Sequence, residues 1–113
     1  MLNPIGSGSG SPSQYKSLVL NETTSNYYAE KGDYYYYKIT AYKSGTMYIY
    51  CDNCTLMSLT DNDGSITTRS LSNTSSVFDT KKSFYVEYGK TYYIKVKAQS
   101  DGLIKIRVSE YNY

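Results

Sequence analysis

The sequence predicts an all-β protein that folds as a single antiparallel β-sandwich. Apolar and polar residues alternate at period two in several short segments, and turn-forming residues separate these segments about every dozen positions. No segment shows the helical period of about 3.6 residues. The chain of 113 residues has the length of one such domain.

The tyrosine-rich segment at residues 32–42 (GDYYYYKITAY) predicts the central strand. Aromatic residues favour strands, and successive side chains of a strand point to opposite faces. One face then carries Tyr35, Tyr37, Ile39 and Ala41, which can close over a core. The other face carries Tyr34, Tyr36, Lys38 and Thr40. We therefore expect one buried face and one exposed aromatic face.

Four further strands are expected before the turn signal at residues 61–64 (DNDG). The third of them, TMYIYC, directs Met47, Ile49 and Cys51 to the core and Tyr48 and Tyr50 outward. These four predicted strands are residues 15–20, 26–30, 46–51 and 54–60.

The remaining part of the chain predicts two weak and three strong strands. Residues 65–70 form an edge-type strand, and residues 77–80 pair briefly. The three strong strands are residues 83–88, 91–98 and 103–109. Their inward residues are Phe84, Val86, Tyr88, Tyr92, Ile94, Val96, Ala98, Ile104, Ile106 and Val108, whereas Tyr85 and Tyr93 point outward.

Residues 1–14 (MLNPIGSGSGSPSQ) are predicted to be an arm or linker in front of a domain at residues 15–113. Glycine and serine favour a flexible chain, and Pro4 and Pro12 interrupt regular structure. The segment lacks the basic and apolar regions of a secretory signal. No apolar run reaches the roughly 20 residues of a membrane helix, so we expect no membrane insertion.

The composition argues against two classes of function. Twelve basic and ten acidic residues give a net charge of +2, which is too small to indicate a nucleic-acid partner. Histidine is absent, which removes Ser-His-Asp and Cys-His catalysis and histidine metal sites. We therefore expect that the protein is not an enzyme.

The outward tyrosines are the strongest indication of a binding surface. Aromatic side chains are enriched where proteins contact partners, because they supply a large contact area at low entropy cost. The alternative is that they form cross-strand pairs that only stabilise a sheet. The candidate binding residues are Tyr34, Tyr36, Tyr48, Tyr50, Tyr85 and Tyr93.

Cys51 and Cys54 flank a two-residue loop, Asp52-Asn53. Residues in these positions of a hairpin lie roughly 5.5 Å apart at Cα, which a disulfide can span. Three alternatives remain open: a local disulfide, two free thiols, or a bond between subunits in an oxidising compartment. A zinc site would need ligands that the chain lacks.

Acidic residues near the predicted strand ends suggest calcium as a possible ligand. Glu22, Glu30 and Asp33, with Asn21, could gather oxygen ligands. The alternative is a solvated rim of turns. At residues 61–64 the turn interpretation is favoured over a calcium loop, because Ser72 stands where an EF-hand requires glutamate.

Several motifs also follow one another in a characteristic order. Gly32-Asp33 precedes the aromatic strand, and LMSLTDNDG (residues 56–64) is followed by YGKTYYIKV (88–96) and DGLIKIRVSEY (101–111). This order resembles the bacterial pre-peptidase C-terminal (PPC) domain, a family that includes the collagen-binding domains of clostridial collagenases. The resemblance implies a jelly-roll-like β-sandwich without catalytic residues, attached to a secreted enzyme. It also implies calcium binding by acidic residues near the first strands and collagen binding by exposed tyrosines.

Two functions follow as expectations for an extracellular or cell-surface protein. In the first, the chain is a self-assembling structural subunit, such as that of a fibre, whose arm at residues 1–14 docks on a neighbouring copy. In the second, the domain is an accessory module of a secreted hydrolase that binds collagen or polysaccharide through its tyrosines.

Overall fold

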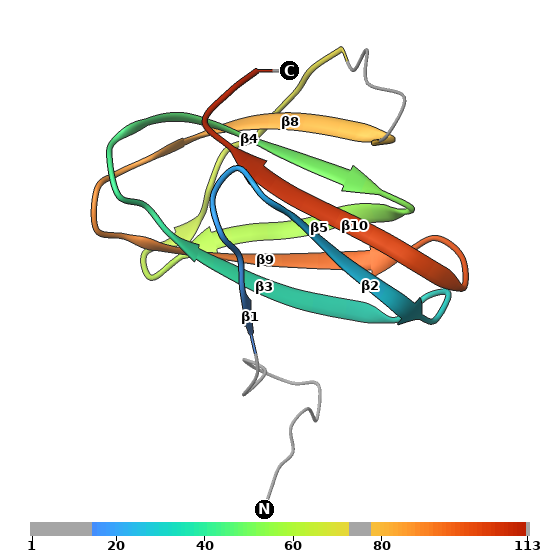
Figure 1. Ribbon diagram of the computed structural model, residues 1–113. Coiled ribbons are helices and arrows are strands. Elements are labelled where there is room, and N and C mark those ends of the chain that lie inside the picture. The colour runs from blue at the N-terminus through green and yellow to red at the C-terminus, as the bar shows by residue number, and fades with distance from the viewer. Residues whose placement is uncertain (1–14, 73–77, 113) are drawn as a thin grey trace, which may run out of the picture.

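The computed structural model describes residues 15–72 and 78–112, and the predicted arm at residues 1–14 lies outside this part of the chain. The described residues form ten strands and no helix, and therefore no helix long and apolar enough to cross a membrane (Figure 1). The strands are β1 (Lys16–Ser17), β2 (Thr23–Ala29), β3 (Tyr34–Thr40), β4 (Gly45–Asp52), β5 (Cys54–Asp61), β6 (Gly64–Ser65), β7 (Arg69–Ser70), β8 (Thr80–Val86), β9 (Thr91–Ala98) and β10 (Gly102–Ser109).

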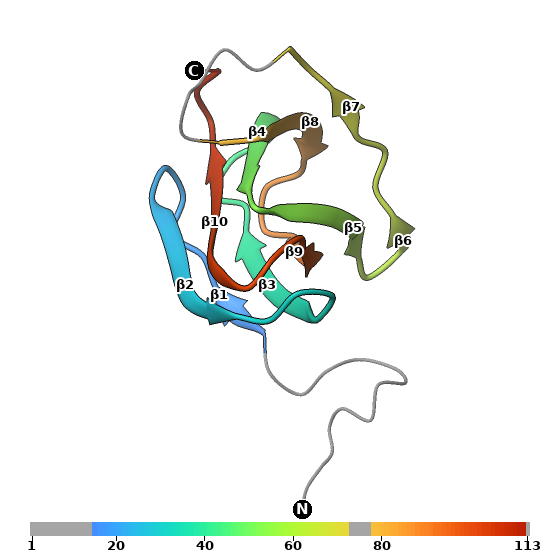
Figure 2. The same cartoon turned by 90° about the vertical axis from the view of Figure 1, so that its right-hand side faces the viewer.

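The strands form two five-stranded sheets that pack face to face (Figure 2). The first sheet has the order β1-β3-β9-β5-β6, and the second has the order β2-β10-β4-β8-β7. All strand pairs are antiparallel except β1 with β3, which is parallel. Successive long strands alternate between the two sheets, and the last strand, β10, lies beside β2. This is the jelly-roll order, which confirms the predicted fold class.

The core lies between the two sheets and follows the predicted alternation. In β3, Tyr37 and Ile39 are buried, and Tyr35 packs against the core from its edge. The predicted inward residues of β4, β9 and β10 are all buried as well. Because a strand alternates its side chains strictly, the buried face could be read directly from the sequence.

The structure corrects the predicted strands in the second half of the chain. Residues 65–70 do not form one strand, because β6 pairs with β5 in the first sheet and β7 pairs with β8 in the second. The two strands predicted at 77–80 and 83–88 are one strand, β8, although residue 77 lies outside the described part. Since β8 ends at Val86, Tyr88 does not reach the core and is exposed.

Candidate functional site

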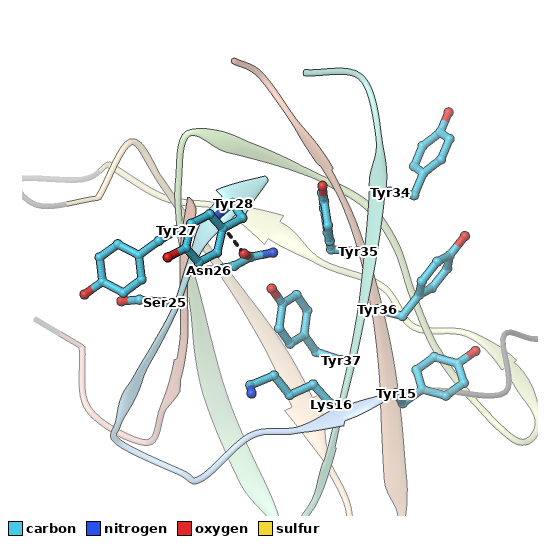
Figure 3. Close-up of a pocket in the computed structure, with 10 residues that line it drawn as sticks. All are labelled: Tyr15, Lys16, Ser25, Asn26, Tyr27, Tyr28, Tyr34, Tyr35, Tyr36 and Tyr37. Carbon is cyan, nitrogen blue, oxygen red and sulfur yellow. Dashed lines mark hydrogen bonds between the residues drawn. The ribbon is translucent and has the colours of Figure 1, made fainter. Parts of the chain in front are cut away.

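A groove of about 590 Å³ opens at one edge of the sandwich, where β2 of the second sheet faces β3 of the first (Figure 3). Seven of its ten lining residues are tyrosines. Tyr35 and Tyr37 project from β3 toward β2, whereas Tyr34 and Tyr36 project from the opposite face of β3. The lining tyrosines are Tyr15, Tyr27, Tyr28, Tyr34, Tyr35, Tyr36 and Tyr37.

The β3 side of the groove is a strand edge that is only partly paired. The parallel strand β1 pairs with Tyr37 and Lys38, and the Leu18 N–H donates to the Lys38 carbonyl at 2.8 Å. Within the described residues, no strand pairs with residues 34–36 on this side. Backbone groups along this stretch are therefore available to a further strand.

The β2 side of the groove is an edge of a different kind. The ladder between β2 and β10 shifts register between the pairs Ala29 with Gly102 and Asn26 with Ile104, which leaves an extra residue in β2. The Asn26 side chain accepts a hydrogen bond from the Tyr28 N–H at 3.0 Å. Such a bulge interrupts edge-to-edge pairing, so this edge of β2 is protected over its tyrosines.

The bulge also explains why both tyrosines of β2 are exposed. Tyr27 and Tyr28 are adjacent, and strict alternation would turn one of them to the core, yet their exposed fractions are 64% and 88%. The sequence did not indicate them as site residues, and Tyr15 was missed as well. The repeated aromatic in NYYAE was the only available signal, because a bulge has no clear sequence pattern.

The inner end of the groove is formed by Tyr37, which is almost fully buried. Burial, with a smaller contribution from Cys54, raises the pKa of the Tyr37 hydroxyl to about 12. Tyr35 is fixed by its own hydroxyl, whose oxygen accepts a hydrogen bond from the Glu30 N–H at 2.8 Å. One side of the groove is therefore a wall of buried or hydrogen-bonded tyrosines, and the other side carries the exposed rings of Tyr27 and Tyr28.

Three of the six predicted tyrosines share one surface, the outer face of the first sheet. Tyr34 and Tyr36 come from β3, and Tyr93 comes from the neighbouring strand β9. Tyr15 inserts between two of them, with its ring centroid 5.9 Å from that of Tyr36 and 4.9 Å from that of Tyr93. Lys95 lies over the Tyr34 ring, with its Nζ 4.3 Å from the centroid.

The other three predicted tyrosines do not join this surface. Tyr48 and Tyr85 belong to β4 and β8 of the second sheet, on the far side of the molecule. Tyr50 was expected to point to solvent but is buried, with an exposed fraction of 1%. Its ring packs on Phe78 at 5.4 Å, and its hydroxyl donates to the Tyr111 carbonyl at 3.2 Å. The six candidate tyrosines therefore do not form one surface, and Tyr50 is not exposed as expected.

The predicted calcium ligands do not come together. Glu22 precedes β2, whereas Glu30 and Asp33 follow it, so the seven residues of β2 separate them by roughly 20 Å along the strand. The described residues hold no cluster of three or more carboxylate or thiol groups that could bind a metal ion. Glu30 and Asp33 lie in the turn between β2 and β3, and Glu22 lies at the other end of β2, so the three carboxylates do not form one site.

Residues 61–64 form the turn that the sequence favoured. The Asp61 carboxylate accepts hydrogen bonds from the N–H groups of Asp63 at 2.7 Å and Gly64 at 3.1 Å. These backbone bonds, together with the nearby Lys90, hold the pKa of Asp61 below its usual value. Lys90 also contacts Asp63 at 3.3 Å, so a cation of the chain already pairs with both carboxylates of this turn.

Cys51 and Cys54 lie at the corner where β4 of the second sheet passes into β5 of the first. Both are free thiols and both are fully buried, which matches one of the three alternatives. A hydrogen bond with Cys54, and burial, raise the pKa of Cys51 well above its usual value. Because neither sulfur reaches the surface, a bond between subunits would require this corner to open.

Comparison with known proteins gives no independent indication of function. No protein-family model, curated protein or solved structure matches this chain. The resemblance to the PPC domain therefore stays a prediction.

Proposed function

We propose that this protein is a non-catalytic structural subunit of an extracellular or cell-surface assembly. In this assembly, residues 1–14 of one copy dock in the tyrosine-lined groove of a neighbouring copy. The observation that supports this proposal most directly is the edge of β3 at residues 34–36, which pairs with β9 on one side, has no partner strand among the described residues on the other, and borders the groove.

The register of β1 indicates how a docked strand would lie. Lys16 pairs with Tyr37 in parallel orientation, and Tyr15, which precedes it, contacts Tyr36, so a docked segment in this register would run along residues 35 and 34. Such a segment would gain backbone hydrogen bonds from β3 and would cover the tyrosines of the groove. The protected edge of β2 would contribute contact area but no ladder.

The docking segment would come from residues 1–14, which lead into Tyr15 at the rim of the groove. Leu2 and Ile5 are its large aliphatic side chains and would pack against the tyrosines. Fully extended, 14 residues reach about 46 Å, more than the 39 Å length of the folded domain. This length allows the arm to reach a second copy, and repeated head-to-tail docking would give an open fibre.

The proposal is tested by comparing the full chain with a chain that starts at Tyr15. The core lies between Leu18 and Val108, so we expect the shortened chain to fold. Sedimentation velocity and electron microscopy of the full chain should show oligomers or fibres, and the shortened chain should be monomeric. Two monomeric chains, or oligomers that persist without the arm, would contradict the proposal.

A paired substitution locates the docking site. Tyr27→Ser with Tyr28→Ser changes two exposed side chains of the groove and should abolish association of the full chain while leaving the fold intact. Tyr85→Ser is the matched control, because Tyr85 is similarly exposed but lies on the other sheet. Equal loss of association in both variants would argue against docking in the groove.

The second function expected from the sequence, binding of collagen or polysaccharide as an accessory module, has support from a different observation. Tyr34, Tyr36 and Tyr93 share the outer face of the first sheet with Tyr15. Tyr34 and Tyr36 project from the face of β3 opposite to Tyr35 and Tyr37 (Figure 3), although both of them, with Tyr15, also border the groove.

A further inference from the structure

We propose that the outer face of the first sheet binds a linear polysaccharide that carries carboxylate or sulfate groups. This goes beyond assembly through the groove. The surface consists of the row Tyr34, Tyr36, Tyr15 and Tyr93 with Lys38, Lys95 and Lys97, which we call the tyrosine–lysine row.

The register between β3 and β9 builds this row from cross-strand pairs of one tyrosine and one lysine. Tyr34 lies opposite Lys97, Tyr36 opposite Lys95, and Tyr93 opposite Lys38. Lys95 also reaches diagonally to Tyr34, where its Nζ is 4.3 Å from the ring centroid, and lies 6.0 Å from the Tyr36 centroid. These cation–π and ring contacts hold the side chains in place before a ligand arrives, which lowers the entropy cost of binding.

The charges on this face favour an anionic ligand. The three central strands of the sheet, β3, β9 and β5, carry three lysines and one carboxylate, Asp61. That carboxylate is held by the N–H groups of Asp63 and Gly64 and lies 3.5 Å from the Lys90 ammonium. Asp61 lines a hollow beside Lys38 but already has Lys90 as its partner, so the three lysines of the row leave an excess of positive charge on these strands.

The neighbouring hollow favours a sugar polymer over a single small anion. A depression of about 480 Å³ adjoins the Tyr15–Tyr93 end of the row and is also lined by Lys38, Thr60, Asp61 and Asn62. The hydroxyl and amide groups there can hydrogen-bond sugar hydroxyls, while the ammonium and phenol groups of the row donate to oxyanions. A linear polysaccharide is the ligand that can contact the tyrosine–lysine row and this depression at the same time.

The ring packing argues against single-stranded nucleic acid on the same surface. Stacking of bases requires open ring faces. Here Lys95 covers the Tyr34 ring, and Tyr15 is packed against both Tyr36 and Tyr93. A neutral triple-helical peptide, in turn, would leave the three lysines without a counter-charge.

The test measures binding of the full chain to polygalacturonate and to dextran sulfate, which separate carboxylate from sulfate recognition. Neutral dextran is the uncharged control, and poly(U) is the competing polyanion. We expect binding to at least one of the first two polymers, weakening as salt is raised, and no binding to dextran. Poly(U) should bind less tightly than the preferred polysaccharide.

Matched substitutions then locate the surface. Lys95→Gln should weaken binding about tenfold, because one charge-assisted contact contributes about 1.4 kcal/mol. Lys105→Gln makes the same charge change on β10 of the other sheet and should leave binding unchanged. Tyr36→Phe should weaken binding more than Tyr85→Phe does.

Several outcomes would overturn the proposal: no binding to either anionic polysaccharide, equal losses for Lys95→Gln and Lys105→Gln, or tighter binding of poly(U). Association through the groove is a separate outcome, because Tyr27→Ser with Tyr28→Ser alters only the β2 side. Loss of assembly with retained polysaccharide binding would leave this inference standing.

Discussion

Tyr92 shows how tyrosine serves as a large core residue. The chain contains no tryptophan and only 2 phenylalanines. Its ring is buried and lies 6.1 Å from that of Phe84 across the sandwich. Its hydroxyl oxygen accepts a hydrogen bond from the Glu87 N–H at 2.8 Å, which fixes the turn before β9. Tyr35 makes the same kind of contact with the Glu30 N–H before β3. Tyrosine thus contributes both to the core and to the turns beside it.

Removing the Tyr92 hydroxyl should destabilise the fold, because the Glu87 N–H would lose its partner in a partly buried place. We expect Tyr92→Phe to lower the free energy of unfolding by about 1–2 kcal/mol. Tyr85→Phe is the control and should change it by less than about 0.5 kcal/mol, since Tyr85 is exposed. Urea denaturation followed by circular dichroism measures both, and equal effects would contradict this role of Tyr92.

The exposure of single tyrosines was only partly predictable from the sequence. Alternation correctly separated Tyr37 from Tyr34 and Tyr36, because these residues share one strand with a buried face. It failed for Tyr50, because Phe78 and Tyr111, which are distant in sequence, cover a position that alternation assigns to solvent. A local pattern states which face a residue occupies, but not what lies on that face.

At the scale of elements, the two edges that border the groove differ although both are rich in tyrosine. β3 presents a regular edge that, within residues 15–72 and 78–112, β1 covers at Tyr37 and Lys38 alone. β2 carries a bulge, and Asn26 binds the Tyr28 N–H. A bulge of this kind disfavours pairing of a further strand with β2, whereas the regular edge of β3 is the one that our proposal uses for the docked strand.

The turn between β4 and β5 depends on Asn53, which has a φ of 60°. Its side-chain amide donates to the carbonyls of Ser100 and Leu103, each at 3.1 Å, and its side-chain oxygen accepts from the Ser100 hydroxyl at 2.8 Å. This one residue therefore joins the β4–β5 turn to the turn between β9 and β10.

Two substitutions separate the backbone and side-chain roles of Asn53. Asn53→Gly keeps the positive φ but removes the three hydrogen bonds, and should cost about 1–2 kcal/mol of unfolding free energy. Asn53→Ala should cost about 1 kcal/mol more, because alanine is strained at this φ. Asn62→Ala, in the exposed β5–β6 turn, should have little effect. Denaturant titration measures all three, and equal costs for glycine and alanine would show that the backbone conformation contributes nothing.

At the scale of the whole molecule, Glu110 joins three segments that are far apart in sequence. It forms an ion pair with Lys43 after β3, and its carboxylate accepts hydrogen bonds from Asn21 before β2 at 2.9 Å and from the Tyr42 hydroxyl at 3.0 Å. Lys43, followed by Asn21, holds the pKa of Glu110 down at about 2. The carboxylate thus links these three segments at one end of the sandwich.

This cluster predicts how stability depends on pH. Because the folded pKa of Glu110 is below its usual value of 4.5, its contribution should be complete above pH 4.5 and should be lost as the pH falls toward about 2. Glu110→Gln should therefore be less stable than the wild type at pH 7, and the difference should shrink between pH 4.5 and pH 2. Urea midpoints measured across this range test the prediction, and a constant difference would contradict it.

The sequence by itself determined the fold class and most of the core, because strict alternation marks the inward side of each long strand. The tertiary structure decided which tyrosines meet. The pairing of strands places Tyr15 between Tyr36 and Tyr93. It also puts Tyr48 and Tyr85 on the other sheet and places Glu22 and Glu30 at opposite ends of β2. The physical reason is that alternation is a property of one strand. The order of strands in a jelly roll depends on contacts between distant segments, which no local pattern contains.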